Sequence, residues 1–277
     1  MKRLLITICV VVGMLLTVNV DVKAVIAPSL WLQFEGPDGQ TTTVDSSANA
    51  HTIALLGTPA PQAQLDTDYH AVGAASLLLD GSNDYATAAP TTSPDWDICA
   101  SNTDNWTISF YVRLDTHAGT TGLMYQGTDA SNRWAIRNVH GNGLLFSVMS
   151  SASDVISTGY GREITDSDWH WIALCKIGDG SSSRYALYND GNQANYTSDP
   201  DTRDFTGLLN IGRTSGPGTS YYYTDGNMDE VMIYHDNVFG ANPNSDKTDH
   251  ITNIPEPATI ALLGLGALSL LRRKRSV

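Results

Sequence analysis

The stretch that decides the fold is "WTISFYVRLD", residues 106–115. Its residues alternate between apolar and polar, which on an extended chain sorts them onto opposite faces. Trp106, Ile108, Phe110, Val112 and Leu114 share one face. This period of two predicts a β-strand with one buried face and one wetter face. The same pattern recurs in residues 29–35, 134–139, 143–149, 169–177 and 183–189, while residues 208–213 and 228–234 resemble strands buried on both faces.

Turn chemistry separates these strands. Clusters of Gly, Asn, Asp and Ser occupy residues 79–84, 140–143 and 178–183, and Asp190-Gly191 is a strong signal for a tight hairpin. Residues 91–105 form the longest irregular insertion, and no long stretch between Val25 and Asn253 has helical periodicity. Ten or more short strands at this spacing predict an all-β fold, a two-sheet antiparallel jelly-roll sandwich, in one domain over residues 25–253.

Both ends of the chain resemble processing signals. Met1-Lys2-Arg3, an apolar run over residues 4–18 and small residues up to Ala24 predict a secretory signal peptide, residues 1–24, that is cleaved after Ala24. An uncleaved anchor is the alternative, but a run of about 15 residues is short for a membrane span. We therefore expect an N-terminal signal helix ahead of the folded domain.

The C-terminal segment, residues 254–277, is polar, then apolar, then basic. A Pro-Glu-Pro triplet precedes an apolar segment over residues 258–271, which as a helix rises about 21 Å and falls short of a full hydrocarbon core. The basic residues that follow would stay in the cytoplasm by the positive-inside rule. This predicts a short C-terminal apolar helix that holds the domain outside the membrane.

The central region is strongly acidic. The chain has 16 basic and 29 acidic residues, and residues 25–253 contain 9 of the basic and 27 of the acidic ones. Such a domain repels phosphate backbones, so nucleic acid is excluded as a partner. Of its acids, 24 are Asp, which suits turns and binds calcium well.

Two cysteines lie in the predicted domain, Cys99 and Cys175. In an exported protein they could form a disulfide, or each could be a small buried apolar residue. The sequence leaves these alternatives open because it does not give the distance between their Cα atoms.

The ordered set of motifs resembles a known family. "WLQFEG" and "TVDSSANAHTIALLG" (within 31–57), "AASLLLDGSNDYATAA" (74–89), "WTISFYVRLD", "SDWHWIALCKIGDGSSSRYALYNDGNQ" (167–193), "LLNIGRT" and "GNMDEVMIYHDNV" (226–238) are similar to LamG-like jelly rolls of the concanavalin A-like lectin/glucanase superfamily. The resemblance implies a sandwich whose first and last strands lie close together. It departs from the family where "SANAH", ending at His51, lacks the usual glycines, which puts a ligand role for that loop in doubt.

The C-terminal segment resembles a PEP-CTERM sorting signal. The motif residues are Pro255, Glu256 and Pro257, followed after the apolar segment by Arg272, Arg273, Lys274 and Arg275. The resemblance implies processing by an exosortase, a membrane protease, in a Gram-negative-type bacterium. The protein would be anchored transiently in the inner membrane and then reach the cell surface or extracellular matrix. A simple C-terminal anchor is the alternative.

The resemblance also implies a structural calcium ion. Asp45 and Asn49 in the early loop, and Asp229 and Glu230 in the last predicted strand, match family positions and could meet if those strands are adjacent. Calcium takes six to eight oxygen ligands, which such side chains supply. The alternative is that Asp45 caps a turn and Glu230 is an ordinary hydrogen-bonded carboxylate.

The candidate binding residues are aromatic, because sugars stack on exposed rings beside hydrogen-bonding groups. Tyr221, Tyr222 and Tyr223 lie in a glycine-bounded loop, and neighbours on an extended chain point in opposite directions, so at least one should be exposed. Trp96 and Trp134 are further candidates, with core packing as the alternative for each.

The pattern of a glycan hydrolase is missing. The three glutamates of the domain are far apart in sequence. The glucanase members of the superfamily that the chain resembles carry a Glu-x-Asp-x-x-Glu string, which places two carboxylates on one strand face, and this sequence has no such string. We therefore expect no catalytic residues and predict an exported protein that binds extracellular polysaccharide or a surface protein. A matrix protein without a discrete ligand site, and a glycan hydrolase or lyase with an unrecognised site, are the alternatives.

Overall fold

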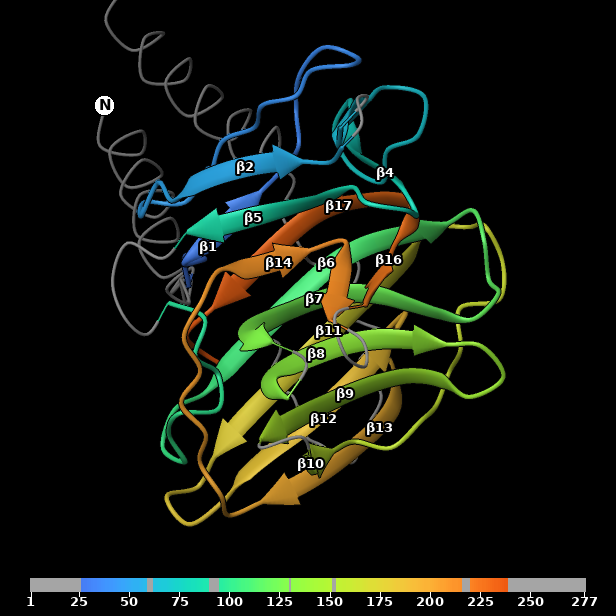
Figure 1. Ribbon diagram of the computed structural model, residues 1–277. Coiled ribbons are helices and arrows are strands. Elements are labelled where there is room, and N and C mark those ends of the chain that lie inside the picture. Colours follow the sequence, from blue (N-terminus) through green and yellow to red (C-terminus); the bar gives the residue numbers. More distant parts are fainter. Residues whose placement is uncertain are drawn as a thin grey trace, which may run out of the picture.

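The structure, a computed structural model, describes residues 26–58, 62–89, 95–129, 131–150, 153–215 and 220–238. These residues form strands, turns and loops, with no helix among them (Figure 1). Two antiparallel sheets face each other, which confirms the predicted all-β jelly-roll sandwich. No helix within these ranges is long and apolar enough to span a membrane. The predicted signal peptide and sorting segment lie outside them.

The first sheet has eight strands in the order β13-β12-β11-β6-β17-β4-β3, with β1 also paired to β17. Its strands are β1 (Leu30–Leu32), β3 (Gln64–Asp66), β4 (Ser76–Asp80), β6 (Trp106–Leu114), β11 (His170–Gly178), β12 (Ser183–Asn189), β13 (Asn192–Asp199) and β17 (Asp225–Tyr234).

The second sheet has seven strands in the order β10-β9-β8-β7-β14-β5-β2. Its strands are β2 (Thr52–Leu56), β5 (Tyr85–Ala89), β7 (Thr120–Asp129), β8 (Asn132–Val139), β9 (Gly143–Ser150), β10 (Ser153–Ser157) and β14 (Leu209–Ile211). A separate two-stranded sheet pairs β15 (Arg213–Ser215) with β16 (Tyr221–Tyr223). We call this pair the β15–β16 hairpin.

The core fills the space between the two large sheets, because each sheet turns one alternating set of side chains inward. All five apolar residues on the predicted inner face of β6 are buried in this core. On the second sheet the core includes Trp134, Ile136, Leu209 and Ile211. Residues between these, such as Asn210 and Ala135, therefore point to the outer face of the second sheet.

The tight hairpin at residues 189–192 is confirmed. Asp190 and Gly191 both have positive φ, 50° and 72°, as a two-residue turn between β12 and β13 requires. The Asp190 carboxylate accepts hydrogen bonds from the backbone N–H of Trp171 at 2.9 Å and from Nδ1 of His170 at 2.7 Å. The turn is thereby tied to the beginning of β11.

The predicted strand over residues 29–35 is shorter in the structure. Only Leu30–Leu32 pair with β17, and Phe34 has a φ of 53°, which lies outside the β region. β1 therefore occupies one half of an edge of β17, and β4 pairs with residues 225–228 along the other half. The first and last strands are adjacent, as the family resemblance implied.

The disulfide is absent from the structure. Cys99 and Cys175 are both buried thiols, and they lie on opposite sides of the first sheet. Cys99 belongs to the core between the sheets, whereas Cys175 on β11 packs on the outer face with Trp171, Ala173 and Tyr188. The disulfide alternative was wrong because a sheet separates the two side chains.

Candidate functional site

The candidate site lies where the β15–β16 hairpin packs on the outer face of the second sheet. β7 carries a glycine, Gly122, under the hairpin. A Cβ atom on Gly122 would come within 2.3 Å of both the backbone N of Thr214 and the backbone O of Tyr222. Thr224, just after the hairpin, donates a hydrogen bond from Oγ1 to the Gly122 carbonyl at 2.8 Å. Because Gly122 has no side chain, the hairpin can lie directly on the sheet.

Arg213, the first residue of the hairpin, is held between two tyrosine rings. Its guanidinium carbon lies 3.3 Å from the ring centroid of Tyr85 on β5 and 4.5 Å from that of Tyr221 on β16. Nε and Nη2 of Arg213 donate to Oδ1 of Asn210 at 3.1 Å and 2.9 Å. The stack therefore joins β5, β14 and the hairpin by cation–π and hydrogen-bond contacts.

Tyr125 on β7 lies beneath this stack. It pairs across the sheet with Asn210 and Ala135, which places its side chain on the outer face. Burial raises the pKa of Tyr125 to about 12, and the neighbouring hydroxyls of Tyr221 and Tyr85 act in the same direction, while Arg213 opposes them. Tyr125 is therefore a neutral phenol at physiological pH.

Two further arginines occupy the outer face of β8. Arg133 is buried and donates from Nη1 to the carbonyl and the hydroxyl of Ser215, so it fixes the hairpin from below. Arg137 is partly exposed, pairs across the sheet with Gly122, and donates from Nη2 to Oγ of Ser147 at 2.8 Å. We call the set Tyr85, Tyr125, Arg133, Arg137, Arg213, Tyr221 and Tyr223 the tyrosine–arginine face.

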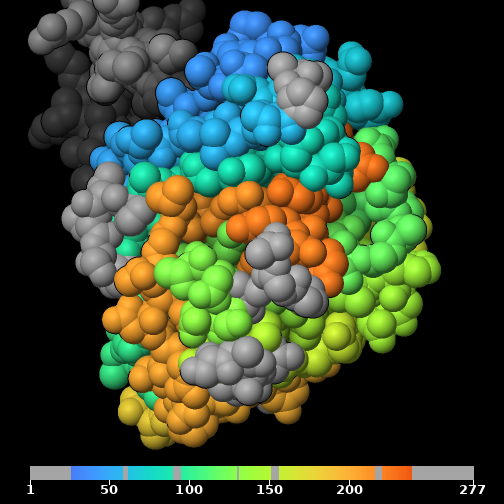
Figure 2. Space-filling model, viewed as in Figure 1, coloured from blue at the N-terminus to red at the C-terminus, as the bar shows by residue number. Residues whose placement is uncertain are grey.

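Of the predicted tyrosines, Tyr221 is 41% exposed, and Tyr222 and Tyr223 are partly buried. The rings of Tyr221 and Tyr223 lie 6.1 Å apart between centroids. In Figure 2 the orange atoms of this region lie at the surface, between the teal atoms around β5 and the green atoms of β7 and β8. The expectation that at least one of the three is exposed is confirmed.

The sequence pattern does not single out Tyr85, Tyr125, Arg137 and Arg213. Each lies at a single polar position beside a core residue, and nothing in the spacing indicates that β5, β7, β8 and the hairpin meet there. One feature of the sequence does indicate part of the site: Tyr85, Asn210 and Arg137 alternate with apolar residues, which places their side chains on the face away from the core.

Trp96 and Trp134 are core residues, so the prediction that they offer exposed stacking surfaces was wrong. Their side chains are 1% and 0% exposed. Trp134 donates from Nε1 to Oε1 of Gln126 at 2.8 Å and to the carbonyl of Trp96 at 3.1 Å. They anchor the irregular segment after residue 95 to the inner face of β8.

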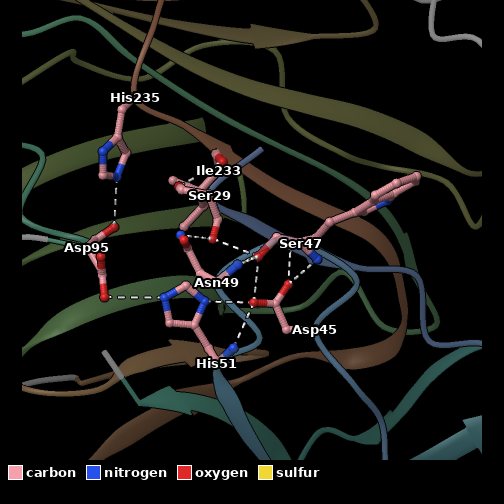
Figure 3. A network of polar contacts seen from close by, with 9 residues as sticks. Ser29, Asp45, Ser47, Asn49, His51, Asp95, Ile233 and His235 are labelled. Carbon is pink, nitrogen blue, oxygen red and sulfur yellow. Dashed lines mark hydrogen bonds and ion pairs between the residues drawn. The ribbon is translucent and has the colours of Figure 1, made fainter. Parts of the chain in front are cut away.

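Hydrogen bonds organise the loop that is predicted to hold calcium (Figure 3). Asp45 accepts hydrogen bonds from the backbone N–H groups of Trp31, Ser47 and His51, from the Ser47 hydroxyl at 2.8 Å and from His51 Nδ1 at 2.7 Å. Burial opposes ionisation of Asp45, but the backbone N–H donors outweigh it and lower the pKa of this carboxyl. Nε2 of His51 contacts Asp95 at 3.2 Å, so one imidazole links two carboxylates.

Asn49 serves the same loop, since its side-chain amide donates to the Ser29 carbonyl at 2.9 Å. The hydrogen-bond donors around Asp45 already use both of its carboxylate oxygens. The loop of Asp45 and Asn49 therefore has the geometry of a capped turn.

Asp229 and Glu230 lie at a bulge in β17, and Glu230 has a φ of 47°. Asp229 accepts from the backbone N–H groups of Ala71 and Val72, and Glu230 accepts from the indole of Trp31 at 2.6 Å. Burial raises the pKa of Asp229 to about 7 and raises that of Glu230. Trp31 thus separates Glu230 from Asp45, and no group of three or more His, Cys, Asp or Glu that could hold a metal ion occurs in the described ranges.

Two models of known protein families match the sequence. A family model described as the concanavalin A-like lectin/glucanases superfamily matches residues 80–240, more than half of the chain. The chain belongs to this superfamily. A second model, the PEP-CTERM protein-sorting motif, matches residues 253–275 and indicates an exported protein sorted to the cell surface or extracellular space. No curated protein matches the sequence.

Solved structures share the fold at low identity. One is domain 4 of AbnA, a GH43 extracellular arabinanase from Geobacillus stearothermophilus, in complex with arabinotriose, at 16% identity and a TM-score of 0.56 over 81% of this chain and 98% of that one. Another is the botulinum neurotoxin type G receptor binding domain, at 14% identity and a TM-score of 0.52, covering 81% of this chain and 50% of that one. This superfamily member thus spans about half the length of the neurotoxin structures it matches.

Proposed function

We propose that this exported superfamily member binds carbohydrate of the extracellular matrix through the tyrosine–arginine face and is not an enzyme. The observation that carries the proposal is the stack of Arg213 between Tyr85 and the exposed Tyr221 on an otherwise regular sheet face. Aromatic rings held rigid by a cation offer sugars a stacking surface at low entropic cost, and the arginine and tyrosine edges offer hydrogen bonds. A partner protein at the cell surface could use the same groups.

The similar structures support this proposal in general terms. The arabinanase domain was solved with arabinotriose, and botulinum neurotoxin type C, another protein of similar structure, depends for cell entry on interaction with two ganglioside molecules. Both ligands contain sugars. We further propose that an exosortase processes the sorting motif after transient anchoring in the inner membrane of a Gram-negative-type bacterium, with delivery to the cell surface or matrix.

Affinity electrophoresis of the full chain through gels containing different polysaccharides tests the proposed function. We expect at least one polysaccharide to retard the protein and Tyr221→Ala to lower the affinity about tenfold or more, as loss of a stacked aromatic does. Tyr196→Ala is the matched control, because Tyr196 is 49% exposed but lies on β13 of the other sheet. If Tyr221→Ala and Tyr196→Ala change the affinity equally, the tyrosine–arginine face is not the binding site.

New reducing ends after incubation with a retarding polysaccharide would identify an enzyme instead. If no polysaccharide retards the protein, the result would favour a matrix protein without a discrete ligand site.

A further inference from the structure

The charge on the tyrosine–arginine face is unusual for this protein. Residues 25–253 contain 27 acidic and 9 basic residues, and three of those basic residues, Arg133, Arg137 and Arg213, share this one face. Three arginines elsewhere pair with neighbouring aspartates: Arg113 with Asp115, Arg184 with Asp179 and Arg203 with Asp201. Arg162 donates instead to the backbone carbonyl of Gln193.

Arg137 and Arg213 form no ion pair with any carboxylate whose side chain the structure describes, a set that excludes Asp154. The Nε atom of Arg137 is buried and has no hydrogen-bond partner there, and neither has the buried Thr214 hydroxyl beside Gly122. Buried polar groups are normally hydrogen-bonded, so these two atoms leave hydrogen-bonding capacity beside Gly122 unused. A guanidinium with free N–H groups and no counter-charge is suited to an anion.

The two arginines approach Gly122 from opposite sides. Gly212, the residue before Arg213, donates its backbone N–H to Leu123 of β7, and Arg137 pairs with Gly122 from β8 on the other side. Their backbones are therefore about two strand spacings apart, on the order of 10 Å. Two arginines on one sheet face, beside stacked tyrosines, match a polymer that carries repeated negative charges along a chain of sugar rings.

We infer that the ligand of the tyrosine–arginine face is an anionic polysaccharide, bound through its acidic groups by Arg137 and Arg213. This inference rests on the proposed function and adds the chemical class of the ligand. The anionic group is a carboxylate, as in uronic acids, or a sulfate ester, since both offer oxygens to a guanidinium. The acidic remainder of the domain repels polyanions, so binding must depend on this local face rather than on net charge.

The test compares matched polymers on the full chain by affinity electrophoresis. The probes are polygalacturonate, the same polymer after reduction of its carboxyl groups to alcohols, and dextran sulfate beside dextran. We expect the anionic member of at least one pair to bind at least tenfold more tightly than its neutral partner. We also expect higher salt to weaken this binding, because salt screens exposed charge pairs. Preference for the carboxylate or for the sulfate pair identifies the anionic group.

Three variants locate the charge dependence. Arg137→Gln should lower the affinity for the preferred anionic polymer about tenfold and lower that for its neutral partner much less, because only the anionic polymer loses a charge partner. Arg137→Lys should fall between wild type and Arg137→Gln, because lysine keeps the charge but not the planar fork. Arg184→Gln, which removes an exposed arginine on β12 of the other sheet, should have no effect. An unchanged melting temperature shows that each variant is folded.

Three outcomes would overturn the inference, and they are distinguishable. Equal binding of charged and neutral partners rejects the anionic ligand but leaves carbohydrate binding in place. If Arg137→Gln and Arg184→Gln lose the same affinity for the anionic polymer, the tyrosine–arginine face is not the site that recognises the charge. If neither these polymers nor any other polysaccharide retards the protein, the proposed function itself is rejected.

Discussion

His170 is a residue whose ionisation should affect stability. Its Nδ1 and Nε2 lie 2.7 Å from Asp190 and 2.9 Å from Asp166, and its side chain is 13% exposed. The hydrogen bond to Asp190 is the largest cause that raises the pKa of His170 to about 9; burial opposes it, and Asp166 adds to the rise. The imidazole is therefore cationic in the folded protein at neutral pH.

The sign of the resulting pH dependence follows from the raised pKa. Between an unfolded pKa near 6.5 and about 9 the folded state binds more protons, so this contribution is complete below pH 6.5 and is lost as the pH rises through 9. After allowance for solvent screening of its exposed partners it amounts to roughly 1–2 kcal/mol. Urea unfolding of wild type and His170→Asn should therefore differ by this amount at pH 6 and by much less at pH 10. A difference that is equal at both pH values contradicts this role.

At the scale of elements, Gly122 decides whether the hairpin can rest on the second sheet. A Cβ atom at this position would clash with backbone atoms of Thr214 and Tyr222, which cannot rotate away. We expect Gly122→Val to displace the hairpin, to lower the free energy of unfolding by about 1–3 kcal/mol and to abolish glycan retardation. In Gly141→Ala a Cβ atom meets nothing within 4 Å, although the φ of 74° is strained for alanine. This variant, which can lose stability without displacing the hairpin, should keep the binding. If Gly122→Val still binds the polysaccharide, the hairpin is not part of the binding site.

The elements themselves were largely predictable, because period-two alternation records which face of each strand is buried. β6, β8, β9, β11 and β12 lie where the alternation placed them, and the Asp190-Gly191 turn has the expected backbone. The end of β1 was not predictable, since the positive φ of Phe34 is set by its burial in the core and not by its own propensity. The candidate site was predicted only at Tyr221–Tyr223, because Tyr85, Arg137 and Arg213 come together through pairing between strands that are distant in sequence.

At the scale of the whole molecule, calcium remains a prediction. An ion bound by Asp45, Asn49, Asp229 and Glu230 would have to replace the hydrogen bonds that these residues now accept or donate. If it binds, calcium added to the chelated full chain at a hundred times its Kd should raise the melting temperature by several degrees, and Asp45→Asn should remove the rise. An unchanged melting temperature after chelation and re-addition contradicts calcium binding.

At the scale of the whole molecule, we propose that the protein binds its ligand on the outer face of its second sheet. A crystal structure of the protein soaked with an oligosaccharide cut from a retarding polysaccharide tests it most directly. We predict sugar rings over Tyr85 and Tyr221, with an acidic group within hydrogen-bond distance of the guanidinium of Arg137 or Arg213. Sugar bound elsewhere, for example at the loops of the first sheet, with the tyrosine–arginine face empty, would contradict the account.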